Sequence, residues 1–207
     1  MNRVKVVRAG DAALLVEAAD LATAHRLNAA LRDEPLPGVV DVVPGERTVL
    51  VVADPAADLG RLAERLTRLR LPDDTGGDAE PVEIPVTYDG ADLDEVAELT
   101  GLARGEVVRR HCAATYTVAY LGFSPGFGYL TGLDPALRVA RRASPRTSVP
   151  AGSVAIADRY AAVYPAPSPG GWRLLGRSEL RLWDVTRDPP ALLRPGMRVR
   201  FVARESR

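Results

Sequence analysis

Residues 121–172 hold a dense run of glycine, proline and aromatic residues, and this run constrains the fold more than any other feature. Its three blocks are LGFSPGFGYL at 121–130, SPRTSVPAGSV at 144–154 and YPAPSPGGW at 164–172. Proline fixes one backbone dihedral and glycine frees one, so the blocks specify defined loop shapes. Any single block is better explained as a structural turn. Three of them among short apolar runs favour rigid loops on a β scaffold that build a binding site.

The second half of the chain is predicted to be mostly β. Two short helices come first, one starting with a capping-box pair, Asp92 and Glu95, and ending at Gly101, the other over Gly105–His111. Short strands precede and follow them, at Val82–Tyr88, Thr115–Leu121, Val154–Ala157, Ala162–Tyr164, Arg173–Leu175 and Met197–Ala203. Many short strands with Gly/Pro turns predict a closed or nearly closed β-barrel.

The first half predicts a small α+β domain. Its expected strands are Val4–Val7, Ala12–Glu17, Val39–Val43 and Thr48–Val52, with helices at about Asp20–Asp33 and Ala56–Leu71. This order favours an antiparallel sheet with two helices on one face. Each half of this domain has two strands followed by a helix, which hints at an internal repeat. The polar segment Leu71–Glu80 is the best boundary. We therefore predict two domains, 1–78 and 79–207.

Composition excludes several classes of function. The net charge is zero and the sequence pI is near 6.8, so no global field favours nucleic acid or a membrane surface. No apolar run is long enough to span a membrane. Cys112 is the only cysteine, which excludes an internal disulfide framework and a cysteine-rich metal site. We therefore expect a cytoplasmic protein without a metal. Lys5 is the only lysine, so a catalytic lysine is not expected.

Several blocks match one known family in order and spacing. They are His111–Tyr116, Gly122–Phe127 with Tyr129-Leu130, Pro145-Arg146, Val149–Val154, Tyr164-Pro165, Ser168–Trp172 with Gly176-Arg177, and Arg194–Phe201. On these residues the chain resembles the bacterial B-type subunits of 5-oxoprolinase, also named allophanate hydrolase subunit 1. That family includes an inhibitor of a sporulation histidine kinase, and related sequence occurs in the carboxyltransferase region of urea carboxylases.

The resemblance implies a cyclophilin-like β-barrel after the α+β domain. It also implies a paralogous partner, the C-type subunit of 5-oxoprolinase (allophanate hydrolase subunit 2), in a heterotetramer with two copies of each chain. In the 5-oxoprolinase system a third subunit joins them, and ATP drives the opening of pyroglutamate, a small cyclic amide, to glutamate.

The chain departs from the family pattern at two places. Gly128 stands where Pro or Ala is usual. Arg159–Val163 reads RYAAV where family members carry Gly-Gln-Thr-Gly-Ile. If those Gln and Thr side chains touch substrate, Tyr160 and Ala161 cannot replace them, which leaves the substrate open.

Two residues are candidates for catalysis. His111, just before the first barrel motif, is a candidate acid, base or oxygen ligand, and a structural histidine at the end of a helix is an equal alternative. Arg146, on a loop stiffened by Pro145, could grip a carboxylate or phosphate bidentately, with a structural salt bridge as the equal alternative.

The candidates for substrate binding come from the three loop blocks. They are Phe123, Pro125, Gly126, Phe127, Ser153, Gly170, Gly171 and Trp172. The aromatic rings could form an apolar wall or the interface with the C-type partner, and core packing is the alternative. The turn at 168–171 could present N–H groups to an anion, and Ser153 could offer its hydroxyl or only stabilise a turn.

The chain lacks the phosphate-binding loop Gly-x-x-x-x-Gly-Lys-Ser/Thr and the serine hydrolase motif Gly-x-Ser-x-Gly. An incomplete catalytic set is typical of one half of a composite site. We therefore predict a non-autonomous subunit of an ATP-dependent amide-hydrolysing complex, most simply 5-oxoprolinase, with ATP bound by the complex. The alternatives are a regulatory protein that inhibits a histidine kinase, and an allophanate hydrolase subunit 1.

Overall fold

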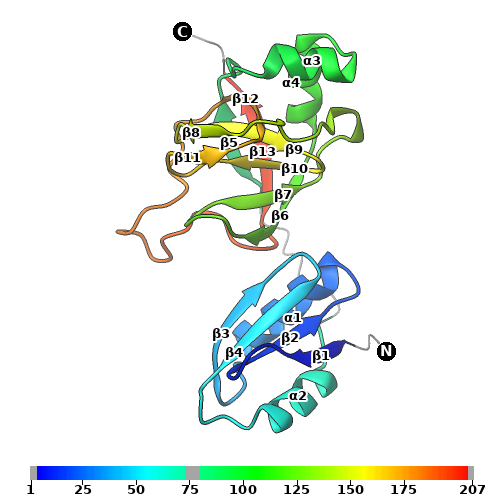
Figure 1. The fold of residues 1–207 in the computed structure, drawn as a ribbon, viewed down its shortest axis with the longest axis vertical. Coiled ribbons are helices and arrows are strands. Elements are labelled where there is room, and N and C mark those ends of the chain that lie inside the picture. Colours follow the sequence, from blue (N-terminus) through cyan, green and yellow to red (C-terminus); the bar gives the residue numbers. More distant parts are fainter. Residues whose placement is uncertain (1–3, 73–79, 205–207) are drawn as a thin grey trace. The chain divides into compact units, whose positions relative to one another are not determined.

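The computed structural model describes residues 4–72 and 80–204. The chain divides into two compact units, residues 1–78 and 79–207 (Figure 1). Each unit has its own hydrophobic core. Among the described residues, no helix combines the length and apolar character needed to cross a bilayer.

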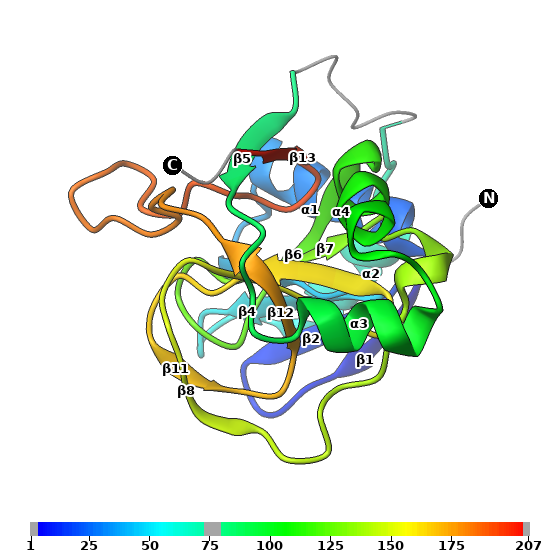
Figure 2. The ribbon, with the colours of Figure 1, turned by 90° about the horizontal axis from the view of Figure 1, so that it is seen from above.

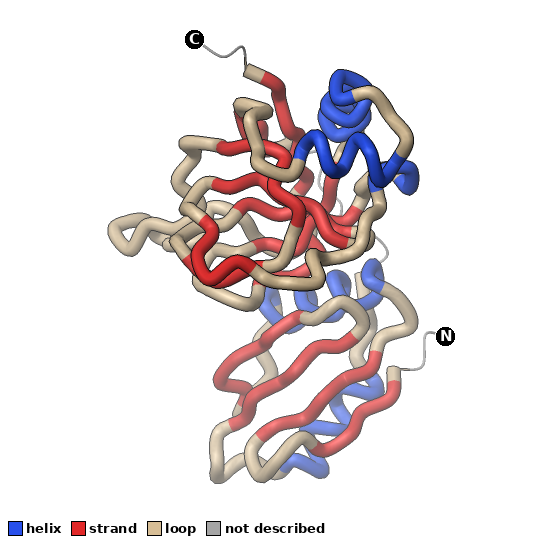
Figure 3. Tube along the Cα trace, turned by 45° about the horizontal axis from the view of Figure 1, so that its top comes forward, coloured by secondary structure: helices blue, strands red, loops and turns tan. Residues whose placement is uncertain are grey.

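The first unit is a four-stranded antiparallel sheet in the order β1-β2-β4-β3. Its strands are β1 (Lys5–Arg8), β2 (Ala13–Glu17), β3 (Val39–Pro44) and β4 (Thr48–Ala53). Its helices are α1 (Leu21–Asp33) and α2 (Leu59–Arg68). Both helices lie on one face of the sheet (Figure 3), which confirms the predicted antiparallel sheet with two helices.

Strand alternation selects the face that the two helices cover. Cross-strand partners Val16 and Val49, and Leu14 and Val51, point to the same side and are buried against Leu27 of α1 and the leucines of α2. The helix starts are set by capping aspartates. Asp20 accepts the N–H of Thr23 at 2.7 Å and Asp58 that of Arg61 at 3.1 Å. The cap at Asp58 explains why α2 begins at Leu59, later than the predicted start at Ala56.

The second unit is built on a seven-stranded sheet in the order β12-β9-β10-β7-β6-β13-β5. These strands are β5 (Val82–Val86), β6 (Tyr116–Leu121), β7 (Gly128–Thr131), β9 (Ser153–Ala157), β10 (Tyr160–Val163), β12 (Arg173–Arg177) and β13 (Arg198–Ala203). Thr87, just after edge strand β5, and Arg177, the last residue of edge strand β12, exchange backbone hydrogen bonds of 2.9 Å, so the sheet is nearly closed. The predicted barrel is confirmed to this extent, and its cyclophilin-like character stays a prediction.

The remaining elements lie around the barrel. They are α3 (Leu93–Thr100), α4 (Arg104–Ala113), the short 3₁₀ helix η1 (Pro135–Leu137), and a two-stranded antiparallel sheet of β8 (Arg146–Val149) and β11 (Ser168–Gly170). A long loop between β12 and β13 extends away from the barrel (Figure 2).

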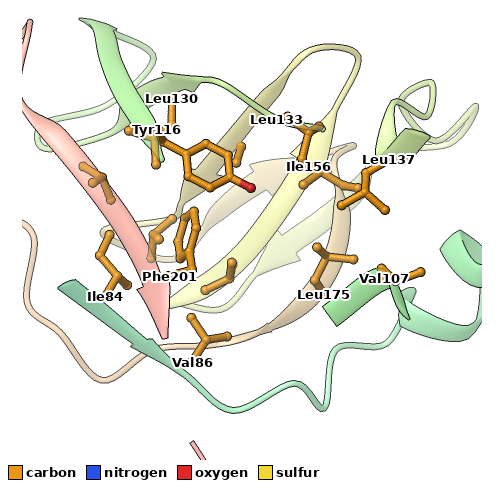
Figure 4. Close-up of a cluster of buried hydrophobic side chains, with 14 of the residues drawn as sticks. Ile84, Val86, Val107, Tyr116, Leu130, Leu133, Leu137, Ile156, Leu175 and Phe201 are labelled. Atoms are coloured by element: carbon orange, nitrogen blue, oxygen red, sulfur yellow. The ribbon is translucent and has the colours of Figure 1, made fainter. Parts of the chain in front are cut away.

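The barrel interior is filled by large side chains from every wall. Figure 4 shows Ile84, Leu130, Ile156 and Leu175 pointing into this core from four strands. The inward residues of β9 alternate with outward ones along the strand, as its pleat requires. The outward side chains of the same strands build the site described below.

Three local predictions are wrong. The predicted turn at 168–171 is not formed, because Ser168–Gly170 is extended and pairs with β8. Arg146 begins that strand and does not sit on a loop. Asp92 precedes α3, yet its side chain makes no capping hydrogen bond, because its carboxylate has other partners.

Candidate functional site

The outer side of the barrel wall carries small residues under a layer of aromatic rings. Along β9 and β10, Ala155, Ala157 and Ala162 face outward, opposite to the large side chains that fill the barrel. Their small volume leaves room for rings to pack on the sheet. The rings form what we call the aromatic face, and its members are Phe123, Phe127, Tyr129, Tyr160, Tyr164 and Trp172.

The rings of the aromatic face touch one another edge to face. Phe127 is central, with its centroid 5.1–5.6 Å from those of Tyr129, Tyr164 and Trp172. Phe123 lies 5.2 Å from Phe127, and Tyr160 lies 5.6 Å from Tyr129. Such geometries stabilise aromatic pairs beyond the area that they bury. The face is therefore one continuous cluster drawn from three separate parts of the chain, in which Phe127, Tyr164 and Trp172 are buried.

The loop Gly122–Phe127 is folded by two consecutive tight turns. The N–H of Ser124 donates to the carbonyl of Gly122 at 2.7 Å, and Phe123 between them has φ +67°, which together define a γ-turn. The N–H of Phe127 then donates to the Ser124 carbonyl at 3.0 Å, with Pro125 and a positive-φ Gly126 as the central residues of a type II turn.

This loop presents Phe123 to solvent, because the ring is 61% exposed although it belongs to an otherwise buried cluster. A non-glycine residue at positive φ is strained, and such strain is concentrated at binding sites. Gly126 cannot be replaced without movement, because a Cβ there would lie 2.9 Å from the Cβ of Trp183. The loop is therefore rigid and holds the Phe123 ring in an exposed position.

Beside the aromatic face, a buried carboxylate gathers two arginines. Asp92, 1% exposed, accepts hydrogen bonds from both terminal nitrogens of Arg146 at 2.7 and 2.9 Å and from Arg142 at 2.9 Å. It also accepts the backbone N–H of Leu174 at 2.8 Å. Glu95 adds ion pairs to Arg142 and Arg173. We call this group the Asp92 cluster.

Burial alone would raise the pKa of Asp92, but the hydrogen bonds from Arg146 and from the N–H of Leu174 outweigh it and hold the pKa below its usual value. The carboxylate is therefore ionised at neutral pH. It joins the start of α3 to β8 and β12, which carry neighbouring parts of the site. Bidentate pairing fixes the orientation of the Arg146 guanidinium as well as its position.

A cavity of about 510 Å³ opens next to the aromatic face and shares Tyr164 with it. We call it the Tyr164 cavity, and its other lining residues are Ala151, Gly152, Pro165, Arg177, Ser178, Glu179, Leu180 and Arg181. Three of the sequence blocks that carry the family resemblance, around 149–154, 164–165 and 176–177, thus converge on one cavity. Gly152 has φ +80°, and any Cβ there would collide with the carbonyl of Ser178, so only glycine fits this wall.

His111 lies elsewhere, in the barrel core. Its side chain is fully buried between the rings of Tyr116 and Phe201, and burial lowers its pKa to about 3. Its Nδ1 is 2.7 Å from the Tyr88 hydroxyl, while its Nε2 has no partner among the described residues. The imidazole is neutral at physiological pH and has no exposed surface for substrate.

The structure brings together most of the residues predicted for substrate binding. Phe123, Pro125, Gly126, Phe127 and Trp172 belong to the aromatic face or its loop. Gly170 passes directly over the Tyr164 hydroxyl, Gly171 packs on Pro145, and Ser153 is buried at 6% exposure. Arg146 is opposite Gly170 in the β8–β11 pair. His111 is the residue that the structure does not bring to this group.

Sequence reasoning missed Asp92 and Tyr164 as site residues. Asp92 stands 54 residues from Arg146, and an aspartate before a helix is ordinarily a cap, so no local pattern marks it. Tyr164 stands in a matching block, and its burial against Phe127 is the information that the sequence lacks. Burial raises the pKa of its phenol, so the hydroxyl keeps its proton at neutral pH.

The departure at Arg159–Val163 also has a structural meaning. Ala161 faces the barrel interior and is fully buried, so its side chain does not reach the surface. Tyr160 faces the other way, at the end of the aromatic face. Of the two differences, only the one at Tyr160 changes a surface that a ligand can touch. As for metals, the described residues include no group of three or more His, Cys, Asp or Glu side chains that could hold an ion.

Comparison with known proteins identifies the family. A family model described as carboxyltransferase domain, subdomain C and D, matches residues 4–193. The chain belongs to this family. It is 40% identical over 213 residues to the B-type 5-oxoprolinase subunit of Escherichia coli O157:H7, which covers 98% of this chain and 97% of the relative. It is 34% identical to the B-type 5-oxoprolinase subunit of Bacillus subtilis (strain 168), over 97% and 92% of the two chains.

Among solved structures, the crystal structure of TTHA0988 in space group P212121 superposes with a TM-score of 0.83 at 41% identity. The match covers 100% of this chain and 41% of that one, so the chain spans less than half of TTHA0988. The predicted family is confirmed by these relatives, and the fold is shared with a longer protein.

Proposed function

We propose that this chain is a non-autonomous subunit of an ATP-dependent amide-hydrolysing complex of the 5-oxoprolinase type, which opens pyroglutamate to glutamate. Its aromatic face and Tyr164 cavity form one half of a site that a partner, the paralogous C-type subunit of such a complex, completes. The proposal draws on the relatives named as B-type subunits of 5-oxoprolinase, at 34–40% identity over nearly the whole chain.

The single structural observation that carries the proposal is the exposed Phe123. Burying a phenylalanine side chain is worth about 1.5–3 kcal/mol, and this chain alone leaves most of that gain unused at Phe123. The loop instead holds the ring outward at a strained dihedral, beside a cavity lined by arginines. Aromatic anchors of this kind are typical of residues that dominate the binding energy of an interface.

The chemistry explains why one chain alone is insufficient. The lactam of pyroglutamate is stabilised by amide resonance, and coupling to ATP supplies activation by phosphorylation of the amide oxygen. Such a site needs cations for the carboxylate and the phosphate, and a group that moves a proton. In this proposal Arg177 and Arg181 of the Tyr164 cavity face the anionic substrate, Arg146 is a positioning residue, and the partner supplies the proton-transfer group.

Reconstitution tests the proposal directly. The chain is co-expressed with its C-type paralogue and the third subunit, and pyroglutamate-dependent release of ADP is followed. We expect Phe123→Ala to weaken assembly about tenfold or more. Arg177→Ala should lower turnover while the complex still assembles.

A matched control is Arg198→Ala, which removes an exposed arginine of β13 from the same unit and should leave turnover unchanged. Absence of pyroglutamate-dependent ADP release from an assembled complex would refute the proposed substrate. Tight binding to a histidine kinase without binding to the C-type paralogue would favour the regulatory alternative.

A further inference from the structure

The segment between β12 and β13 projects from the barrel as a folded unit (Figure 2). We call residues 178–193 the arm. Its base is anchored in the barrel core by Leu182 and Leu193, which are each 2% exposed. The two sides of the arm are joined at this anchor, where the N–H of Leu192 donates to the carbonyl of Leu182 at 2.9 Å. The direction in which the arm leaves the barrel is therefore fixed.

The outer part of the arm is held by hydrogen bonds within the segment. The N–H of Asp184 donates to the Pro190 carbonyl at 3.0 Å, and the N–H of Arg187 donates to the Asp184 carbonyl at 3.1 Å, which closes a four-residue turn at the tip. The Asp184 carboxylate accepts the N–H and the hydroxyl of Thr186 at 3.0 and 2.7 Å. The Arg187 guanidinium donates to the carbonyls of Arg181 and Pro190, both at 3.3 Å. A loop that is ordered before binding loses little conformational entropy when a partner docks.

The tip of the arm presents one apolar side chain and one carboxylate. Val185 is 79% exposed, the highest value for a large hydrophobic side chain among the described residues. The Asp188 carboxylate makes no hydrogen bond or ion pair with the residues that the structure describes. The guanidinium of Arg187 is directed back into the arm, so the surface around Val185 is apolar and anionic. Such a surface is complementary to an apolar pocket with a cationic side chain beside it.

The arm is continuous with both parts of the proposed site. The loop that carries Phe123 packs directly on it, because a Cβ at Gly126 would lie 2.9 Å from the Cβ of Trp183 and 3.3 Å from the carbonyl oxygen of Leu182. Residues Ser178–Arg181, at the start of the arm, line the Tyr164 cavity. A protein that docks on the Phe123 loop and on the arm would therefore lie beside the cavity that is proposed to bind the anionic substrate.

The exposure of Val185 has a counterpart on the neighbouring loop. A single exposed valine is ordinary on a protein surface. Here the two most exposed large hydrophobic side chains of the barrel unit, Val185 at 79% and Phe123 at 61%, stand on loops that contact each other. Apolar anchors on adjoining rigid loops are typical of a protein–protein interface.

We propose that the arm is a docking element for the C-type paralogue, with Val185 in an apolar pocket of that partner and Asp188 facing a cationic side chain. Phe123 and Val185 then hold the partner at two points of one interface. The identity of the partner rests on the proposed function, while the contact surface rests on the geometry of the arm.

Binding of the full chain to the purified C-type paralogue, measured by biolayer interferometry, tests this inference. We expect Val185→Lys to weaken binding about tenfold or more, because an ammonium group would enter an apolar pocket next to another cation. Asp188→Asn should weaken binding less and make it less dependent on ionic strength. Hydrogen exchange at residues 183–188 of the wild-type chain should slow when the partner is added.

Val40→Lys is the matched control, because Val40 is 67% exposed on β3 of the first unit, and it should leave binding unchanged. Urea denaturation should give the same free energy of unfolding for Val185→Lys and wild type, since the side chain is exposed. A Val185→Lys protein that binds as tightly as wild type overturns the inference, as does hydrogen exchange at 183–188 that the partner leaves unchanged. A clear loss of stability in Val185→Lys would show that Val185 packs within this chain, and would also overturn it.

The two proposals fail separately. A reconstituted complex that assembles and turns over pyroglutamate normally with Val185→Lys refutes docking by the arm and leaves the proposed function intact. Weaker assembly with Val185→Lys, in a complex whose wild-type form shows no pyroglutamate-dependent ADP release, supports docking by the arm and refutes the proposed substrate.

Discussion

Two buried polar side chains of the barrel unit have opposite surroundings. The Asp92 carboxylate, 1% exposed, accepts hydrogen bonds from two arginines and a backbone N–H. The His111 imidazole, fully buried, has the Tyr88 hydroxyl on Nδ1 and no partner on Nε2 among the described residues. One is a charge surrounded by donors, and the other is a neutral ring surrounded by rings.

The difference shows which of the two organises the site. A buried charge is retained only with complete pairing, so each of its partners is held in place by the others. Asp92 reaches partners 54 and 82 residues away in the sequence, and these stand on β8 and β12 beside the aromatic face. His111 packs against Tyr116 and Phe201 and contributes to the barrel core.

The largest expected effect is on Asp92. Asp92→Ala leaves Arg146, Arg142 and the N–H of Leu174 without their acceptor, and should lower the free energy of unfolding by about 3–5 kcal/mol. Asp92→Asn keeps an acceptor but removes the charge, so its loss should be smaller. Urea denaturation at pH 7 measures both variants.

The matched control for Asp92 is Asp94, whose side chain is 76% exposed and pairs with Arg104 at 2.9 Å. Asp94→Ala should cost less than about 1 kcal/mol, as exposed ion pairs usually do. If the two alanine variants lost similar stability, the Asp92 cluster would not be the organising centre of the site.

The sequence predicts the interactions between residues that are close along the chain, and it does not predict those between distant residues. Strand alternation and helix periodicity are local, so they predict the two-helix sheet and the barrel strands, Ser153–Ala157 to within one residue. An aspartate at the position of Asp92 is locally a helix cap, which is what the sequence predicts for it. Its true partners depend on how β8 and β12 pack, which no local pattern encodes.

The candidate site divides in the same way. The Gly/Pro blocks predict rigid loops, and Phe123, Phe127 and Trp172 do meet in one face. The sequence predicts a loop at Arg146 because β8 and β11 are short strands that contain or follow proline, and proline weakens strand predictions. The role of His111 cannot be assigned from sequence. The burial that makes it neutral comes from the rings of Tyr116 and Phe201, and Phe201 is distant from His111 along the chain.

The second prediction concerns the pH dependence of stability. Burial lowers the folded-state pKa of His111 from 6.5 to about 3, so the unfolded chain takes up a proton first as the pH falls. The contribution of neutral His111 to the free energy of unfolding is fully present above the pKa of this residue in the unfolded chain. It is lost as the pH falls from that value to about 3. Between pH 7 and pH 5 this loss is about 2 kcal/mol.

His111→Leu should remove that pH-dependent contribution, because leucine does not titrate. The variant also loses the 2.7 Å hydrogen bond between Nδ1 and the Tyr88 hydroxyl, but this loss is the same at both pH values. Nearby Tyr88 and Tyr116 have pKa values raised by burial, so they do not titrate in this range. Urea denaturation at the two pH values gives the difference between wild type and variant. An equal pH dependence in both proteins would mean that His111 is hydrated or paired in solution.

The smallest expected effect separates strain from burial at Phe123. Glycine adopts φ +67° without a steric cost, so Phe123→Gly relieves the strained dihedral while it removes a ring that is 61% exposed. We expect the free energy of unfolding to rise by about 1 kcal/mol. Phe123→Ala removes the same ring but keeps the strain, so it should show no gain in the free energy of unfolding.

Both variants should lose binding to the C-type partner equally. A Phe123→Gly protein less stable than Phe123→Ala would show that the dihedral is not strained. If both variants were clearly less stable than wild type, the ring would be packed within this chain, and the argument that it is exposed for a partner would fail.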